Sequence, residues 1–247
     1  KKLGLKIKLA APTGRAAKRL SEATGETALT IHRLLGATPG GQLTHNEDNK
    51  LPLDVLIVDE VSMLDGPLCF HLLRALPLTC RLIFVGDVHQ LPSVGPGNIL
   101  ADILKSEVIP CARLTTIFRQ ARESMIVINA HRINEGKFPI ASKKQPPKAD
   151  FFWVEQSDPA RIQELIVRMV CERMPEVYGL NPLKDVQVLT PMHKGEVGAN
   201  ELNRLLQERL NANGQELKLK QRVFKVGDRV MQIRNNYEKD VFNGDLG

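Results

Sequence analysis

The chain has 247 residues, which is enough for one large domain or two smaller ones. Hydrophobic residues make up 43% of the chain and allow a packed core, while no apolar run is long enough to span a bilayer, so a membrane-spanning helix is excluded. The formal net charge of +6 permits binding to a polyanion such as nucleic acid. The cysteines are scattered and lack the spacing of metal ligands or of a disulfide framework, which indicates reduced thiols in a cytoplasmic protein.

The first half of the chain alternates short apolar strands with helical patterns. Strands are predicted at residues 5–10, 55–58 and 81–85, and helices at 15–22, 30–35, 67–76 and 124–134. Continuous apolar strands between helices are typical of a parallel sheet that is covered on both faces. We therefore predict an α/β, doubly wound fold.

The second half begins after a candidate linker, the lysine- and proline-containing stretch at residues 138–150. A second α/β pattern follows, with strands predicted at 151–154 and 186–189 and helices at 159–174 and 198–211. Further strands are predicted at 226–233 and 237–242, where Asn243-Gly244 suits the tight turn of a small antiparallel β unit.

Two carboxylates directly follow the most apolar strand. Asp59 and Glu60 end the sequence LDVLIVDE, and ligands bind at the carboxyl edge of open α/β sheets. In nucleotide hydrolases the first acid of such a pair holds Mg²⁺, and its neighbour positions or deprotonates the attacking water. Strands also end in acids simply because the next turn is solvated, so the pair alone leaves a structural role open.

The next strand end repeats this chemistry with Gln90, which follows Gly86-Asp87 by one short turn. A glutamine beside a phosphate site can donate from its amide to a γ-phosphate, and because the amide is neutral it can release the product after hydrolysis. An ordinary β-turn within a Pro- and Gly-rich stretch is the alternative interpretation.

Two basic segments add further candidates. Arg119, in LTTIFRQ, can stabilise the charge on a transferring phosphoryl group, or it can pair with an acid at the surface. The hydroxyl of Thr13 and the amides at the start of the predicted helix can hold a nucleic-acid phosphate, and Arg15 adds positive charge. The sequence pattern of the phosphate-binding loop, G-x-x-x-x-G-K-[ST], is absent from this sequence.

Five segments, in this order, resemble motifs Ia, Ib, II, III and IV of RecD-like superfamily 1 ATP-dependent DNA helicases: APTGRAAKRL, TIHRLL, VDEVSMLD, VGDVHQLPSVGPG and IFRQ. The resemblance implies a first RecA-like domain at residues 1–137 and, after the linker at 138–150, the start of a second RecA-like domain at 151–221. Residues 222–247 resemble the start of the family's inserted SH3-like β-barrel. Each motif is weak by itself, and the resemblance rests on the ordered set.

The resemblance implies a role for each matched residue. Asp59 would hold Mg²⁺, Glu60 would activate water, Gln90 would read the γ-phosphate and Arg119 would act as an arginine finger, so ATP and Mg²⁺ are the implied cofactors. Single-stranded DNA would be bound by residues of both domains and of the insertion: Pro12, Thr13, Arg15, His32, Pro92, Ser93, Thr190, Pro191, Met192, Lys194, Asn236 and Tyr237.

The function implied by the resemblance is an ATP-dependent DNA helicase or translocase that moves 5′ to 3′ on single-stranded DNA or at a single-strand/duplex junction. The resemblance further implies a monomer in the bacterial cytoplasm, at the nucleoid, that acts in DNA repair or recombination. Two alternatives stay open: a catalytically inactive nucleic-acid-binding module, and a P-loop ATPase that is not a helicase.

The family's phosphate-binding loop is expected upstream of Lys1, and its later motifs are expected beyond Gly247. We therefore expect the chain to be cut at both ends and to hydrolyse ATP poorly by itself.

Overall fold

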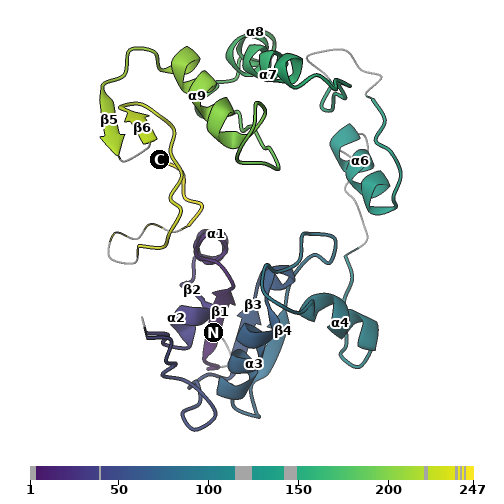
Figure 1. The fold of residues 1–247 in the computed structure, drawn as a ribbon. Helices are drawn as coiled ribbons and strands as arrows, with labels where there is room; N and C mark the ends of the chain where they lie inside the picture. The colour runs from purple at the N-terminus through teal and green to yellow at the C-terminus, as the bar shows by residue number, and fades with distance from the viewer. Residues whose placement is uncertain are drawn as a thin grey trace. The chain divides into compact units, whose positions relative to one another are not determined.

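The computed structural model describes residues 4–38, 40–114, 124–141, 149–219, 222–236, 239, 241 and 243–247. The chain divides into two units, and Figure 1 labels their helices and strands. Unit 1 comprises Lys1–Leu114 and Met231–Gly247, and unit 2 comprises Thr115–Val230, so unit 2 is inserted in the sequence of unit 1. Within the described ranges, no helix has both the length and the apolar character needed to cross a membrane.

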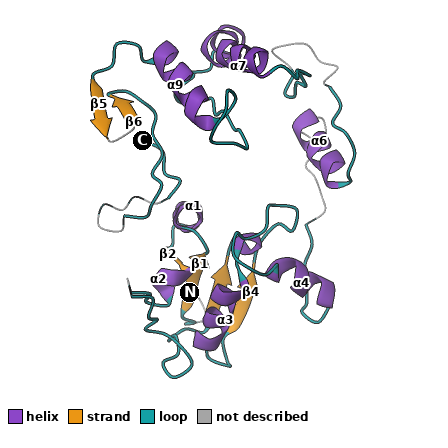
Figure 2. Ribbon diagram, in the orientation of Figure 1, coloured by secondary structure: helices purple, strands orange, loops and turns teal. Residues whose placement is uncertain are grey.

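The centre of unit 1 is a sheet of four parallel strands in the order β2-β1-β3-β4, labelled in Figure 1 and coloured orange in Figure 2. The strands are β1 (Ile7–Ala11), β2 (Ala28–Thr30), β3 (Val55–Val58) and β4 (Arg81–Phe84). The sequence of β3 is VLIV, and three of its four residues are buried, as expected for an inner strand of a parallel sheet. The predicted α/β fold class is therefore confirmed in this unit.

Three helices of unit 1 begin at a short polar side chain that caps them. Thr13 caps α1 (Gly14–Thr24), Thr30 caps α2 (Ile31–Leu34) and Asp65 caps α3 (Gly66–Ala75), each by accepting a bond from a backbone N–H of the first turn. A fourth helix, α4 (Ile99–Ser106), follows the Pro- and Gly-rich loop after β4. The core is formed by β3 and by apolar side chains of α2, α3 and the loops beside them: Ile31, Leu35, Leu56, Val58, Val61, Leu64 and Leu72.

The described residues of unit 2 form helices and one hairpin. The helices are α6 (Met125–Asn134), α7 (Pro159–Arg168), α8 (Met174–Tyr178) and α9 (Ala199–Leu210), and the antiparallel hairpin is formed by β5 (Glu216–Leu219) and β6 (Arg222–Lys225). A π-helical turn, Met169–Arg173, joins α7 to α8. Pro175 explains this turn, because it has no N–H to donate to the carbonyl of Cys171 four residues earlier.

Several predicted strands of the second half are wrong. Residues 151–154 and 186–189 form no strand, and residues 226–233 contain only the single bridge between Met231 and Leu246. The apolar side chains that suggested these strands are largely exposed, with Trp153 58% and Leu189 88% accessible, and no described neighbouring strand pairs with them. The antiparallel pair lies earlier, at β5 and β6, and the predicted strand at 237–242 falls partly outside the described residues.

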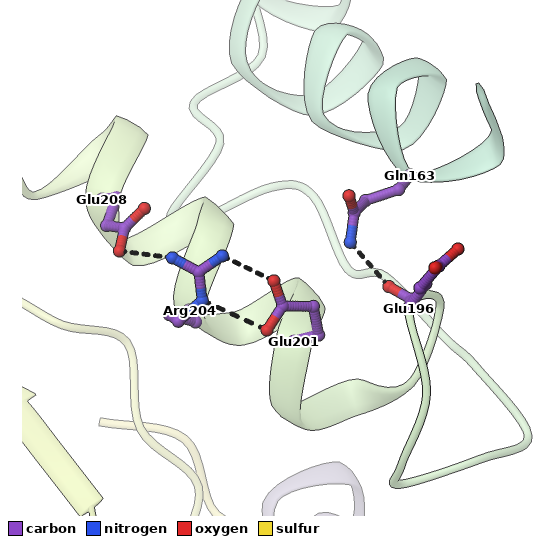
Figure 3. Close-up of polar contacts among 5 residues, drawn as sticks. All are labelled: Gln163, Glu196, Glu201, Arg204 and Glu208. Carbon is purple, nitrogen blue, oxygen red and sulfur yellow. Dashed lines mark hydrogen bonds and ion pairs between the residues drawn. The ribbon is translucent and has the colours of Figure 1, made fainter. Parts of the chain in front are cut away.

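Side-chain hydrogen bonds attach the hairpin of unit 2 to α9. The carboxylate of Asp228 accepts bonds from the side-chain amides of Gln207 and Asn211 and from the backbone N–H of Lys225. On the same helix Arg204 pairs with Glu201 and Glu208 (Figure 3). The hydrogen bonds from Arg204 lower the pKa of Glu201, but both side chains are exposed, so these pairs contribute little to stability.

Candidate functional site

The carboxyl ends of the four parallel strands bring the candidate residues of unit 1 to one edge of the sheet. Ala10 is opposite Val58, Val58 is opposite Phe84, and Ala11 is opposite Thr30. The segments that follow these residues are Pro12-Thr13 after β1, His32 after β2, Asp59-Glu60 after β3 and Gly86–Gln90 after β4. The sequence predicted these segments separately, and the strand register places them at a common edge, where open α/β sheets bind ligands.

Asp59 and Glu60 occupy a tightly defined turn. The backbone N–H of Asp59 donates to the carbonyl of Ala10 at 2.9 Å, which continues the β1–β3 pairing one residue past the strand. The N–H of Glu60 donates to the Asp59 carboxylate at 2.9 Å, and Glu60 has a φ of +54°. Left-handed backbone at a residue with a side chain costs free energy and is concentrated at functional sites. Both side chains are half-buried, so they remain accessible to a ligand at this edge.

The end of β4 lies directly against this turn. The N–H of Val61 donates to the carbonyl of Val85 at 3.0 Å. A Cβ atom at Gly86 would lie 3.1 Å from the nitrogen of Val61 and 3.2 Å from that of Ser62, closer than a side chain ordinarily tolerates. Gly86 therefore permits the close approach of the two strand ends, a function that the sequence pattern alone did not reveal.

Gln90 is exposed in the turn that follows. Its N–H donates to the carbonyl of Asp87 at 3.1 Å, and the carboxylate of Asp87 accepts from the N–H of His89 at 2.9 Å. These bonds fix the backbone of the turn and leave the side-chain amide of Gln90 available to a ligand.

The Pro- and Gly-rich loop after Gln90 folds onto the start of α3. The N–H of Gly66 donates to the carbonyl of Pro96 at 2.8 Å, and a Cβ atom at Gly95 would lie 2.8 Å from the Cβ of Asp65. The hydroxyl of Ser93 donates to the carbonyls of Gly95 and Gly97, at 2.9 and 3.1 Å, so it stabilises the loop in this structure. Pro92 is exposed in the same loop.

Of the DNA-binding candidates that follow β1 and β2, some side chains are exposed and others form hydrogen bonds within the protein. The Thr13 hydroxyl accepts from the N–H of Ala16 at 3.3 Å as the cap of α1, and Pro12 is half-buried. Arg15 is exposed, and its guanidinium donates to the carbonyl of Gly244 at 3.2 Å. His32 is exposed on α2.

The candidates of unit 2 form a loop that folds back onto the start of α9. The Thr190 hydroxyl donates to the carbonyl of Val197 at 2.8 Å, and the N–H of Ala199 donates to the carbonyl of Met192 at 2.9 Å. Pro191, Met192 and Lys194 are exposed on this loop. A side chain at Gly198 would collide with the backbone of Lys194, so the loop requires glycine there. Figure 3 shows a further restraint, in which the side-chain amide of Gln163 donates to the carbonyl of Glu196.

The remaining candidates are Asn236, Arg119 and Tyr237. Asn236 forms an antiparallel bridge with Val241, and its side-chain oxygen accepts from the N–H of Lys239 at 3.1 Å. Arg119 and Tyr237 lie outside the described residues.

The carboxylate oxygens at the sheet edge are suitable ligands for Mg²⁺, but they do not form a complete metal site made only of protein side chains. Mg²⁺ prefers oxygen ligands, retains several waters, and is commonly bound through one or two carboxylates together with substrate phosphates. Asp59 and Glu60 supply two such carboxylates. Within the described ranges, no group of three or more His, Cys, Asp or Glu side chains could hold a metal ion without such help.

Models of two protein families match parts of the chain. A model of an AAA domain matches residues 1–96, and the model of the SH3 domain of ATP-dependent RecD-like DNA helicases matches residues 202–247.

The chain is 40% identical over 245 residues to the ATP-dependent RecD2 DNA helicase of Deinococcus radiodurans, which covers 99% of this chain and 32% of that protein. It is 30% identical over 279 residues to the RecBCD enzyme subunit RecD of Mycolicibacterium smegmatis, which covers 98% of this chain and 48% of that subunit. The chain thus spans about a third to a half of the length of these relatives.

A crystal structure of Pif1 helicase from Bacteroides in complex with ADP-AlF3 and ssDNA aligns with 99% of this chain and 59% of that chain, at 21% identity and a TM-score of 0.39. This structural similarity is too low to add weight to the sequence matches.

Proposed function

We propose that this chain, which is similar to RecD2 and RecD proteins along nearly its whole length, acts in the motor of an ATP-dependent DNA helicase. The observation that supports this proposal most directly is the common sheet edge, where the acidic pair after β3 and the glutamine turn after β4 lie beside the Pro-Thr turn after β1. Nucleotide and nucleic-acid candidates therefore belong to one rigid scaffold, so a change in one segment can be transmitted to the next.

In this proposal the acidic pair and its neighbours carry the ATPase chemistry. Bound Mg²⁺ would neutralise the charge that develops on the phosphates. Asp59 would hold the hydrated metal, and Glu60 would orient and deprotonate the attacking water. The free amide of Gln90 would detect the γ-phosphate, and Arg119 would stabilise the transferring phosphoryl group.

In this proposal each unit contributes residues that contact single-stranded DNA. In unit 1 the proposed contacts are Pro12, Thr13, Arg15, His32, Pro92 and Ser93, and in unit 2 they are Thr190, Pro191, Met192 and Lys194. Asn236 and Tyr237 of the insertion would contribute a further contact. Several of these side chains also hold their own loops in place, so DNA binding would compete with or reinforce those internal bonds.

From the resemblance to the family we further propose translocation from 5′ to 3′ and a preference for single-stranded DNA or a single-strand/duplex junction. We also propose action as a monomer, a role in DNA repair or recombination, and a cytoplasmic location at the nucleoid.

The test is steady-state ATP hydrolysis by the longest natural form of the protein, with and without single-stranded DNA. We expect DNA to stimulate turnover and Glu60→Gln to lower kcat by about 10²–10⁴-fold, the range for loss of a general base. Glu107→Gln is the matched control, because Glu107 is an exposed glutamate with the same φ of +54° and lies outside the site. Its turnover should equal that of the wild type.

Two other results would change the conclusion. An absence of turnover with intact DNA binding would contradict the motor and support a nucleic-acid-binding module. Turnover that is lost in Glu60→Gln but does not respond to DNA would indicate an ATPase that is not a helicase.

A further inference from the structure

Ser62 carries a buried hydroxyl for which the described residues provide no partner. Its side chain is 5% exposed, and its Oγ makes no hydrogen bond within the described part of the chain. Two other buried polar residues of the described chain are satisfied: Thr30 accepts from the N–H of Arg33, and Asn129 pairs with both backbone groups of Ile140. The hydroxyl of Tyr178, in α8 of unit 2, is likewise buried without a partner among the described residues. Because buried polar groups almost always find partners, the hydroxyl of Ser62 requires an explanation.

The position of Ser62 indicates where its partner comes from. It lies in the middle of the turn Val61–Met63, which follows directly on Asp59 and Glu60. The nitrogen of Ser62 is within 3.2 Å of the place that a Cβ of Gly86 would occupy, so Ser62 lies where the ends of β3 and β4 meet.

The turn around Ser62 is firmly held. Val61 and Leu64 are fully buried in the core, and the N–H of Val61 is bonded to the carbonyl of Val85. The backbone of this turn is therefore held in place on the side of the core and on the side of β4.

We propose that Ser62 is a further residue of the nucleotide site, and that its hydroxyl donates a hydrogen bond to an oxygen atom positioned there by a bound Mg²⁺–nucleoside triphosphate. This inference rests on the proposed function. The acceptors that such a ligand brings or orders are all oxygens, from phosphate, metal-bound water and carboxylate, and a serine hydroxyl can donate to each of them. Single-stranded DNA fits less well as the source, because Ser62 is buried, whereas its proposed contacts among the described residues are all exposed or half-buried.

The proposal predicts that Ser62→Ala affects the free and bound states differently. Without ligand the substitution removes no hydrogen bond, so the Tm of the protein should stay unchanged or rise. With Mg²⁺ and a non-hydrolysable ATP analogue, the Kd should increase about tenfold, as expected for one lost hydrogen bond to a charged acceptor. The ligand-induced rise in Tm should shrink accordingly. Calorimetric titration and thermal unfolding of the longest natural form measure both quantities.

Ser21→Ala is the matched control. The Ser21 hydroxyl lies at the far end of α1, donates to the carbonyl of Ala17 at 2.9 Å and accepts from the N–H of Ala28 at 2.8 Å. Its removal should lower the Tm without ligand and leave the Kd for the nucleotide unchanged. If Ser62→Ala does not fold, Ser62→Cys keeps a side chain of similar size with a much weaker donor and should show the same tenfold loss.

Three results would overturn the inference. An unchanged Kd in Ser62→Ala would refute it while the proposed function stands. A fall in the ligand-free Tm as large as that of Ser21→Ala would show that the hydroxyl already has a structural partner. A wild-type protein that does not bind the Mg²⁺–nucleotide at all would remove the proposed function, and the inference with it.

Discussion

The geometry of the sheet edge that carries Asp59 and Glu60 depends on the backbone conformation of single residues as well as on their side chains. Glu60 adopts a left-handed conformation immediately after an inner strand, and Gly86 lets the end of the neighbouring strand approach it. Together these two positions place the acidic pair and the glutamine turn beside one another. A carboxylate at the end of a strand is common, whereas this combination of a strained turn and a close approach is specific to the site.

Gly86→Ala should therefore destabilise unit 1. The added Cβ would lie 3.0 Å from the Cδ2 of Leu100 as well as close to two backbone nitrogens, and overpacking of this kind costs about 1–3 kcal/mol. Urea denaturation of the wild type and the variant measures the change in the free energy of unfolding. Gly40→Ala is the control, because the nearest atom to its added Cβ lies at 3.9 Å, and it should be close to neutral. Equal stability of the two variants would contradict the close approach.

The candidate site could be predicted from sequence only where its chemistry is carried by a local pattern. Asp59, Glu60 and Gln90 follow apolar runs, so their place at a sheet edge can be read directly from the sequence. No local sequence pattern distinguishes Ser62, because its burial depends on the end of another strand. Roles for Arg119 and Tyr237 stay predictions, since both lie outside the described residues.

At the scale of secondary-structure elements, prediction succeeded where burial and pattern agree. The strand predicted at 55–58 is observed with the same bounds, and the helices predicted at 67–76 and 198–211 differ by one residue at each end. The sequence did not reveal β5, because its ELKL residues are all exposed and carry no apolar run. Residues 151–154 show the opposite failure, since apolar character without a neighbouring strand does not make a strand.

The carboxylate of Asp228 contributes hydrogen bonds that attach the β5–β6 hairpin to α9, beside the direct bond from the Gln207 amide to the carbonyl of Val223. Asp228→Ala would remove the acceptor of three hydrogen bonds, at a cost of about 2–3 kcal/mol for the half-buried group. We expect much faster amide hydrogen exchange in residues 216–219 and 222–225, with smaller changes in α6.

Glu208→Ala provides the contrast on the same helix. It removes one exposed ion pair with Arg204, which is worth at most about 0.5 kcal/mol. Exchange in the hairpin should stay as in the wild type. If the amide hydrogens of the hairpin exchange at the same rate in Asp228→Ala and Glu208→Ala, the carboxylate of Asp228 does not anchor the hairpin.

At the scale of the whole molecule, the charge is moderate and spread along the chain, with 34 basic and 28 acidic residues. Aromatic residues make up only 4% of the chain, so stacking on bases would contribute less than contacts with phosphates. Affinity for single-stranded DNA should therefore fall steeply with salt, because each neutralised phosphate releases counterions.

Lys194→Ala should reduce the slope of log affinity against log salt by about 1, because it removes one phosphate contact. Fluorescence anisotropy with a labelled oligonucleotide at several salt concentrations measures this slope. Lys184→Ala removes an exposed lysine of the same unit that is outside the proposed DNA path, and its slope should match the wild type. Equal slopes for all three proteins would exclude Lys194 from the DNA contact.

The division of unit 1 into two stretches of sequence has a consequence for its biosynthesis. Its parallel sheet is complete in the polypeptide by Phe84, yet Gly244 and Asp245, which contact Arg15 and Lys18 of α1, belong to a segment that is translated only after unit 2. From Phe84 to Gly244 the ribosome adds 160 residues (244 − 84), so at about 5–20 residues per second this segment follows the completed sheet after roughly 8–32 s. During that interval α1 is exposed on the ribosome without its C-terminal partner.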